Sequence, residues 1–140
     1  MHVQRTILGL SLLALCGAAR ADAEPGLWEI SATLSVANLP GVVGPLVDTR
    51  CLEAAEANDP GRLFGPSTGA QGCKFVNGSD SGSAYSFEVS CEGALALHGR
   101  GSVRYGRDFM QGSLDLAGGA GAQPVTTHTE ISARRLGPCR

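Results

Sequence analysis

The chain has 140 residues, a net charge of −2 at pH 7 and a hydrophobic content of 43%. This length supports one domain with a modest core. There is a single lysine, Lys74, and no run of basic residues. Nucleic acids and anionic membrane surfaces attract proteins through clustered Lys and Arg side chains. The composition therefore argues against both as partners.

The first 23 residues have the pattern of a secretory signal peptide. A positively charged start precedes the apolar stretch Ile7–Leu15, and small-residue cleavage patterns end at Ala21 and at Ala23. The apolar stretch is shorter than the roughly 20 residues that cross a bilayer. We predict a Sec-type leader at residues 1–23, cleaved near Ala21 or Ala23. A single domain at residues 24–140 follows, periplasmic or secreted and without a transmembrane segment.

The first predicted strand of the mature chain covers Leu27–Val36, where apolar and polar side chains alternate. The only tryptophan, Trp28, is in phase with Ile30 and Leu34. Alternation with a period of two is typical of a half-buried strand. We therefore interpret Trp28 as a core anchor rather than as an exposed platform for a ligand.

One short helix is predicted at Cys51–Asn58 (CLEAAEAN), with Thr49 as its N-cap. Glu53 and Glu56 lie early in this segment, where the helix dipole favours acidic side chains. The next stretch, Asp59–Gly72, is rich in Gly and Pro and is expected to form a loop.

Four cysteines remain once the leader is removed, namely Cys51, Cys73, Cys91 and Cys139. An even number in a small exported domain implies disulfide bonds, for which three connectivities are possible. The cysteines form no C-x-x-C pair and have no His at ligand spacing, which argues against zinc.

A predicted hairpin favours one of these connectivities. The β-prone runs Lys74–Val76 and Tyr85–Val89 flank Asn77–Ser83, a stretch made almost wholly of turn-forming residues. Folding about this turn brings Cys73 opposite the end of its partner strand, within disulfide reach of Cys91. We therefore favour Cys73–Cys91, which leaves Cys51–Cys139.

Alternating patterns continue to the end of the chain and are separated by Gly-rich turns. The predicted later strands are Tyr85–Cys91, Leu95–Tyr105, Met110–Leu116 and Val125–Leu136. Short connections between such strands are typical of an antiparallel meander. We predict a mainly β fold with one short helix. Its single antiparallel sheet would be curved or partly closed, as in a meander or barrel, and stapled by disulfides.

His98 and His128 are the only histidines of the mature chain, and both fall on the polar side of their predicted strands. On adjacent strands, two exposed imidazoles could share a metal ion. No carboxylate or third imidazole stands at convincing spacing, however. We interpret both as surface histidines and expect no metal, no cofactor and no catalytic residue.

Several segments together resemble a known family. They are PGLWEI after the leader, CLEAAEA from Cys51, the spacing of Cys73 and Cys91, HGRGSVRYGRDFMQG at residues 98–112 and the C-terminal RRLGPC. In this order they are similar to exported bacterial proteins of the domain of unknown function 3617 family. The resemblance covers nearly the whole mature chain. It implies a periplasmic, β-rich, disulfide-containing domain and carries over no catalytic residue.

These observations favour a non-catalytic binding or structural module of the cell envelope. Its partner would be an envelope protein or an apolar small molecule. A curved sheet could hold such a molecule on a lining formed by Trp28, Phe87, Leu97, Val103 and Tyr105. The alternative is a cell-envelope hydrolase or metal-dependent enzyme that uses His98 or His128.

Overall fold

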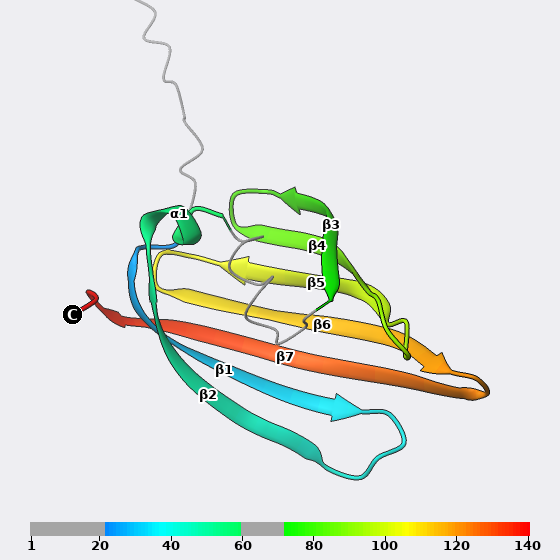
Figure 1. Cartoon of the computed structure of the whole chain (residues 1–140). Coiled ribbons are helices and arrows are strands. Elements are labelled where there is room, and N and C mark those ends of the chain that lie inside the picture. The colour runs from blue at the N-terminus through cyan, green and yellow to red at the C-terminus, as the bar shows by residue number, and fades with distance from the viewer. Residues whose placement is uncertain (1–21, 60–71) are drawn as a thin grey trace, which may run out of the picture.

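The computed structural model describes residues 22–59 and 72–140 and forms one antiparallel sheet with a short helix (Figure 1). The sheet has seven strands in the order β2-β1-β7-β6-β5-β4-β3. The elements are β1 (Gly26–Val36), β2 (Val42–Leu52), α1 (Ala54–Ala57), β3 (Cys73–Asp80), β4 (Ala84–Cys91), β5 (His98–Tyr105), β6 (Phe109–Ala120) and β7 (Gln123–Gly137). The sheet curls without closing, so the predicted mainly β fold is confirmed.

The prediction was wrong over the second strand and the start of the helix. β2 pairs with β1 as far as Leu52, opposite Gly26, so Cys51 belongs to the strand and not to the helix. The helix begins only at Ala54, and its N-cap is Glu53 rather than Thr49. Glu53 forms a capping box with Glu56, which satisfies backbone N–H groups at the helix start.

The turn between β3 and β4 is shorter than predicted. β3 continues through Asn77 to Asp80, because a bulge between Val76 and Ser79 absorbs the turn-forming Asn-Gly pair inside the strand. Asn77 adopts a φ of 53° there, and its side-chain amide donates to Glu88 Oε2 at 2.6 Å. The reversal itself lies at residues 81–83.

Other strand ends also differ from the prediction. β5 begins at His98 rather than Leu95, and residues 92–97 form the connection from β4. β6 continues through the glycines at 118 and 119 to Ala120, because these residues pair with β7. Strand-pairing partners can thus hold Gly-rich sequence in extended conformation where the local pattern indicates a turn.

One face of the sheet is apolar and forms the core. Trp28 is completely buried, and its ring nitrogen donates to the Glu24 carbonyl oxygen at 3.0 Å. The other buried hydrophobic residues are Ala23, Leu52, Ala57, Phe87, Val89, Val103, Tyr105, Met110 and Leu114. Phe87 lies across its cross-strand partner Gly101, where a Cβ atom would come within 2.5 Å of the ring. Glycine at position 101 therefore leaves the space that the Phe87 ring occupies in the core.

Two disulfides tie the sheet together, with the connectivity favoured from sequence. Cys73 and Cys91 are direct cross-strand partners in β3 and β4. Cys51 at the end of β2 bonds Cys139, which follows β7. In the loop-entropy description, closing 18 and 88 residues of separation contributes about 3 and about 4–5 kcal/mol.

Replacing the buried Trp28 by alanine should destabilise the fold more than truncating an aromatic side chain that lies outside the core. We expect Trp28→Ala to lower the free energy of unfolding by about 3–5 kcal/mol, because it leaves a large cavity. Urea unfolding with intact disulfides, followed by far-ultraviolet circular dichroism, measures this. Phe109→Ala is the control, since Phe109 is exposed and should cost about 1 kcal/mol or less. Equal losses for the two variants would contradict the assignment of Trp28 as the core anchor.

Candidate functional site

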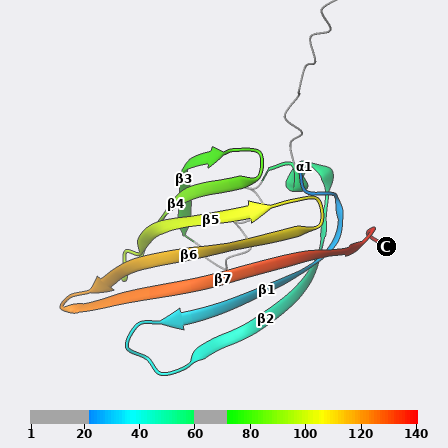
Figure 2. The same cartoon turned by 180° about the vertical axis from the view of Figure 1, so that it is seen from behind.

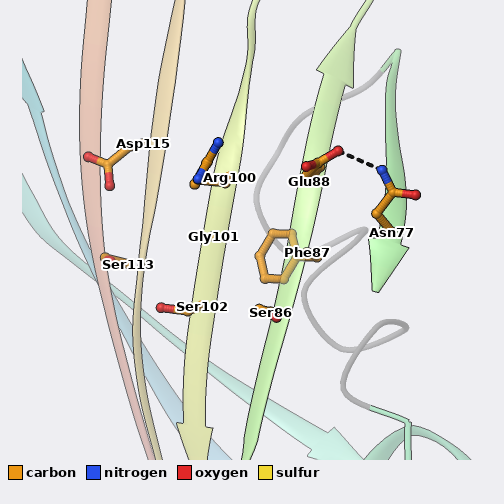
Figure 3. Close-up of a pocket in the computed structure, with 9 residues that line it drawn as sticks. All are labelled: Asn77, Ser86, Phe87, Glu88, Arg100, Gly101, Ser102, Ser113 and Asp115. Carbon is orange, nitrogen blue, oxygen red and sulfur yellow. Dashed lines mark hydrogen bonds between the residues drawn. The ribbon is translucent and has the colours of Figure 1, made fainter. Parts of the chain in front are cut away.

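The polar face of the sheet carries an open groove of about 360 Å³ across β3, β4, β5 and β6 (Figure 3). Its lining comprises Asn77, Ser86, Phe87, Glu88, Arg100, Gly101, Ser102, Ser113 and Asp115. Apart from Phe87 and Gly101, whose side-chain positions belong to the apolar face, these residues are polar. The groove is therefore suited to hydrogen bonding with a polar molecule rather than to holding an apolar one.

Strand register explains why these side chains gather. Directly paired residues on antiparallel strands point to the same face. Ser86, Ser102 and Ser113 are successive cross-strand partners and form a row of hydroxyls. Glu88, Arg100 and Asp115 form the adjacent row, in which the sign of the charge alternates. This alternation lets neighbouring charges compensate one another across the sheet.

The charged row ends at His128 in β7, the cross-strand partner of Asp115. His128 Nδ1 lies 2.6 Å from Asp115 Oδ1, and His128 Nε2 lies 3.8 Å from Glu130 Oε1. The hydrogen bond to Asp115 raises the pKa of His128 above its ordinary value of 6.5. Partial burial opposes this effect, whereas the charges of Asp115 and Glu130 add to it.

The Asp115–His128 pair resembles the acid–base half of a hydrolytic triad, but its surroundings differ from one. In a triad the second ring nitrogen faces a nucleophile, whereas Nε2 of His128 faces Glu130. Ser35, the cross-strand partner of His128, donates to the His128 backbone carbonyl at 3.3 Å instead of to the ring. The arrangement fits an ion pair on a sheet surface.

The two histidines do not lie on adjacent strands, so the arrangement in which they could share a metal ion is not formed. β6 separates β5, which carries His98, from β7, which carries His128. His98 is exposed, and its Nδ1 lies 3.5 Å from the Ala96 carbonyl oxygen. Within residues 22–59 and 72–140, no cluster of three His, Cys, Asp or Glu side chains has the geometry of a metal site.

The residues proposed to line an apolar ligand site lie mostly inside the core. Four of them belong to the same buried hydrophobic cluster, namely Trp28, Phe87, Val103 and Tyr105. The Tyr105 hydroxyl donates to Asp80. Leu97 lies apart from them, half-buried in the connection before β5. The structure thus assembles four of the five residues, in a packed arrangement.

A second candidate surface lies at the end of the sheet away from α1 and the C-terminus (Figures 1 and 2). Neither residues 30–47 nor residues 116–127 contain Asp, Glu, Lys, Arg or His. The two stretches meet because β1 pairs with β7, and the Ala37 N–H donates to the Thr126 carbonyl oxygen at 2.8 Å. We call these two stretches together the uncharged end.

The uncharged end also carries most of the large hydrophobic side chains that the described chain exposes. Five belong to the β1–β2 hairpin, namely Leu39 (64% exposed), Val42 (59%), Val43 (56%), Leu46 (63%) and Val47 (59%). The others, Val76, Leu95, Phe109 and Leu136, are spread over different elements. The alternation of side chains did not predict this surface because β2 lacks that alternation, although the lack of charge between Glu29 and Asp48 is visible in the sequence.

The raised pKa of His128 can be tested directly. Asp115→Asn removes the carboxylate, so the midpoint of the His128 NMR titration should fall towards 6.5. The protonated pair stabilises the wild-type fold below pH 6.5, and this contribution disappears as the pH rises through the higher folded-state pKa. Because both side chains are about half exposed, the stabilisation should be under about 1 kcal/mol. Glu130→Gln is the control and should shift the midpoint less. A midpoint unchanged in Asp115→Asn would contradict the ion pair.

Comparison with known proteins places the chain in one family. No curated protein and no solved structure matches it significantly. The model of a family described as "Protein of unknown function (DUF3617)" matches residues 23–139. This match spans all seven strands, the helix and both disulfides. The chain therefore belongs to the DUF3617 family.

Proposed function

We propose that this protein is a non-catalytic binding module of the periplasm and that the uncharged end is its binding surface. The observation that carries the proposal is the concentration of exposed Leu and Val side chains on the β1–β2 hairpin. Contiguous exposed apolar surface on a folded domain marks an interaction site, whereas scattered single side chains do not.

The distribution of charge supports this proposal. Two ion pairs lie at the end of the sheet opposite the β1–β2 turn, where Arg107 Nη2 lies 3.2 Å from Glu24 Oε1 and Arg134 Nε lies 2.9 Å from Glu29 Oε1. Arg50 pairs there with Glu56 of α1. The sheet end beside α1 is thus suited to water, whereas the β1–β2 turn at the other end carries exposed apolar side chains.

Two features are compatible with export. Two disulfides staple the domain, as is common in oxidising compartments. None of the helices in the described part of the chain is long and apolar enough to cross a membrane. We propose that the protein resides in the periplasm and is exported there by the leader expected from the first 23 residues.

We further propose that the leader is cleaved after Ala21 rather than after Ala23. Ala23 is 3% exposed and belongs to the core, and the Glu24 N–H donates to the Arg107 carbonyl oxygen at 2.9 Å. Cleavage after Ala23 would remove a core side chain and place a charged amino terminus at Glu24.

The cleavage proposal predicts that the mature protein begins with Asp22. Intact-mass spectrometry of the protein purified from the periplasm, with disulfides preserved, measures the amino terminus. Ala19→Leu is a useful variant, since Ala19 belongs to the pattern that ends at Ala21 and not to the pattern Ala21-Asp22-Ala23. A wild-type chain that begins with Glu24 would contradict the proposal.

The apolar lining formed by Trp28, Phe87, Leu97, Val103 and Tyr105 stays a prediction. Most of these side chains fill the core, so a ligand that reached them would have to displace their neighbours. The hydrolase alternative has its best support in the Asp115–His128 pair. It would require a nucleophile at His128 Nε2, where Glu130 lies instead.

Binding of an apolar fluorescent probe tests the proposed surface. We expect bis-ANS to bind the folded protein at the uncharged end, and Leu39→Ser/Leu46→Ser to reduce the bound fluorescence several-fold because both side chains are more than 60% exposed there. Val76→Ser/Leu136→Ser is the matched control, because these side chains are also exposed (44% and 48%) but lie on β3 and β7. Equal reductions in the two variants would show that the uncharged end is no distinct binding surface.

A further inference from the structure

The apolar side chains of the β1–β2 hairpin point to both sides of the sheet. Val43 and Leu46 pair with Leu34 and Ala32, which belong to the apolar face. Val42 and Val47 pair with Ser35 and Ser31, which belong to the polar face. Leu39 lies in the turn between the two strands. The β2 strand of the hairpin therefore presents exposed apolar side chains on both faces of the sheet.

This arrangement does not suit a partner that covers only one face. A protein groove or a second sheet would bury Val43 and Leu46 and leave Val42 and Val47 in water, or the reverse. A surrounding apolar medium buries both sets at once. The inference rests on the proposed function, because it names what the uncharged end contacts.

Addition of a strand from another chain is also disfavoured at this edge. The register of β2 against β1 shifts between Ala32 and Leu34, which places a bulge at Gly44 and Pro45 in the middle of the exposed segment. Bulges and prolines on an edge strand interrupt the row of backbone groups that a new strand would pair with. The side chains, and not the outer edge of β2, are the available contacts.

We propose that the uncharged end inserts its β1–β2 hairpin into the interfacial layer of a lipid bilayer. Insertion stays shallow, because β2 is an edge strand and its unpaired N–H and C=O groups need water or headgroups as partners. Side chains that reach the boundary between headgroups and acyl chains satisfy both requirements. The charged end, with its ion pairs at Glu24 and Glu29, then faces away from the membrane.

The attraction should depend on apolar contact and not on lipid charge. The part of the hairpin within the uncharged end, residues 30–47, contains no Lys, Arg or His, so it has no group that releases counterions from an anionic surface. The lack of clustered Lys and Arg argues only against electrostatic attraction to anionic lipids. An apolar hairpin does not need such attraction to bind a bilayer. Binding should therefore be insensitive to salt and to the fraction of anionic lipid.

Vesicle flotation with the mature, disulfide-bonded protein tests the proposal. We expect measurable partitioning onto phosphatidylcholine vesicles, and Leu39→Ser/Leu46→Ser should lower the partition coefficient about tenfold or more. Partitioning should change less than about twofold between low and high salt, or on addition of phosphatidylglycerol. Val76→Ser/Leu136→Ser is again the matched control and should partition like the wild type.

An introduced tryptophan reports the depth of insertion. Because Trp28 is fully buried, added fluorescence from Leu39→Trp should shift to the blue on vesicles and be quenched by lipids brominated near the headgroup. Val76→Trp should show neither change. These two variants place an aromatic ring at exposed positions, so both are expected to fold.

The possible outcomes separate this inference from the proposed function. Absence of flotation, or flotation that the Leu39 and Leu46 substitutions leave unchanged, would overturn insertion into lipid. If bis-ANS binding is still lost in that variant, the uncharged end remains a binding surface for a protein or an apolar ligand. If bis-ANS binding is also unaffected, both proposals fail. Flotation that depends on anionic lipid would identify electrostatic adsorption and would likewise overturn the inference.

Discussion

The pairing of β1 with β7 is the interaction on which the rest of the structure depends. It joins the first and last strands of the described chain over nearly their whole length, from Leu27 opposite Gly137 to Val36 opposite Thr127. This pairing places β1 in the interior of the sheet, where Trp28 can be buried. It also brings the two segments of the uncharged end together. Because such contacts are distant in sequence, they cost loop-closure entropy before they contribute stability.

The Cys51–Cys139 disulfide supports the same closure. It links the end of β2 to the residues after β7, and β1 lies between these two strands in the sheet. A bond across this three-strand unit removes conformations from the unfolded chain in which the end of β2 lies far from the end of β7. Cys73–Cys91 does the same for the opposite edge, where β3 has only β4 as a neighbour. Each edge of the open sheet is thus held by one covalent bond.

The sequence predicted what depends on local pattern and missed what depends on neighbours. Alternation identified β1, β4 and β7 and the side chains that face the core, because each side of these strands has one environment. It failed at β2, where apolar side chains point to both faces of the sheet and Gly44-Pro45 interrupts the pattern. These side chains are Val42, Val43, Leu46 and Val47. The relation of His128 to Asp115 was equally hidden, because it follows from the strand order and register and not from spacing.

The failure at β2 and the candidate surface have the same physical origin. A strand without alternation has no single buried face, and the apolar side chains that result remain exposed in the folded domain. In water such an edge hairpin favours aggregation. The bulge at Gly44 and Pro45 weakens pairing with another edge but leaves the apolar side chains available. A sequence that disfavours strand addition and yet keeps Leu39 and Leu46 exposed supports the proposal that those side chains contact a partner of another kind.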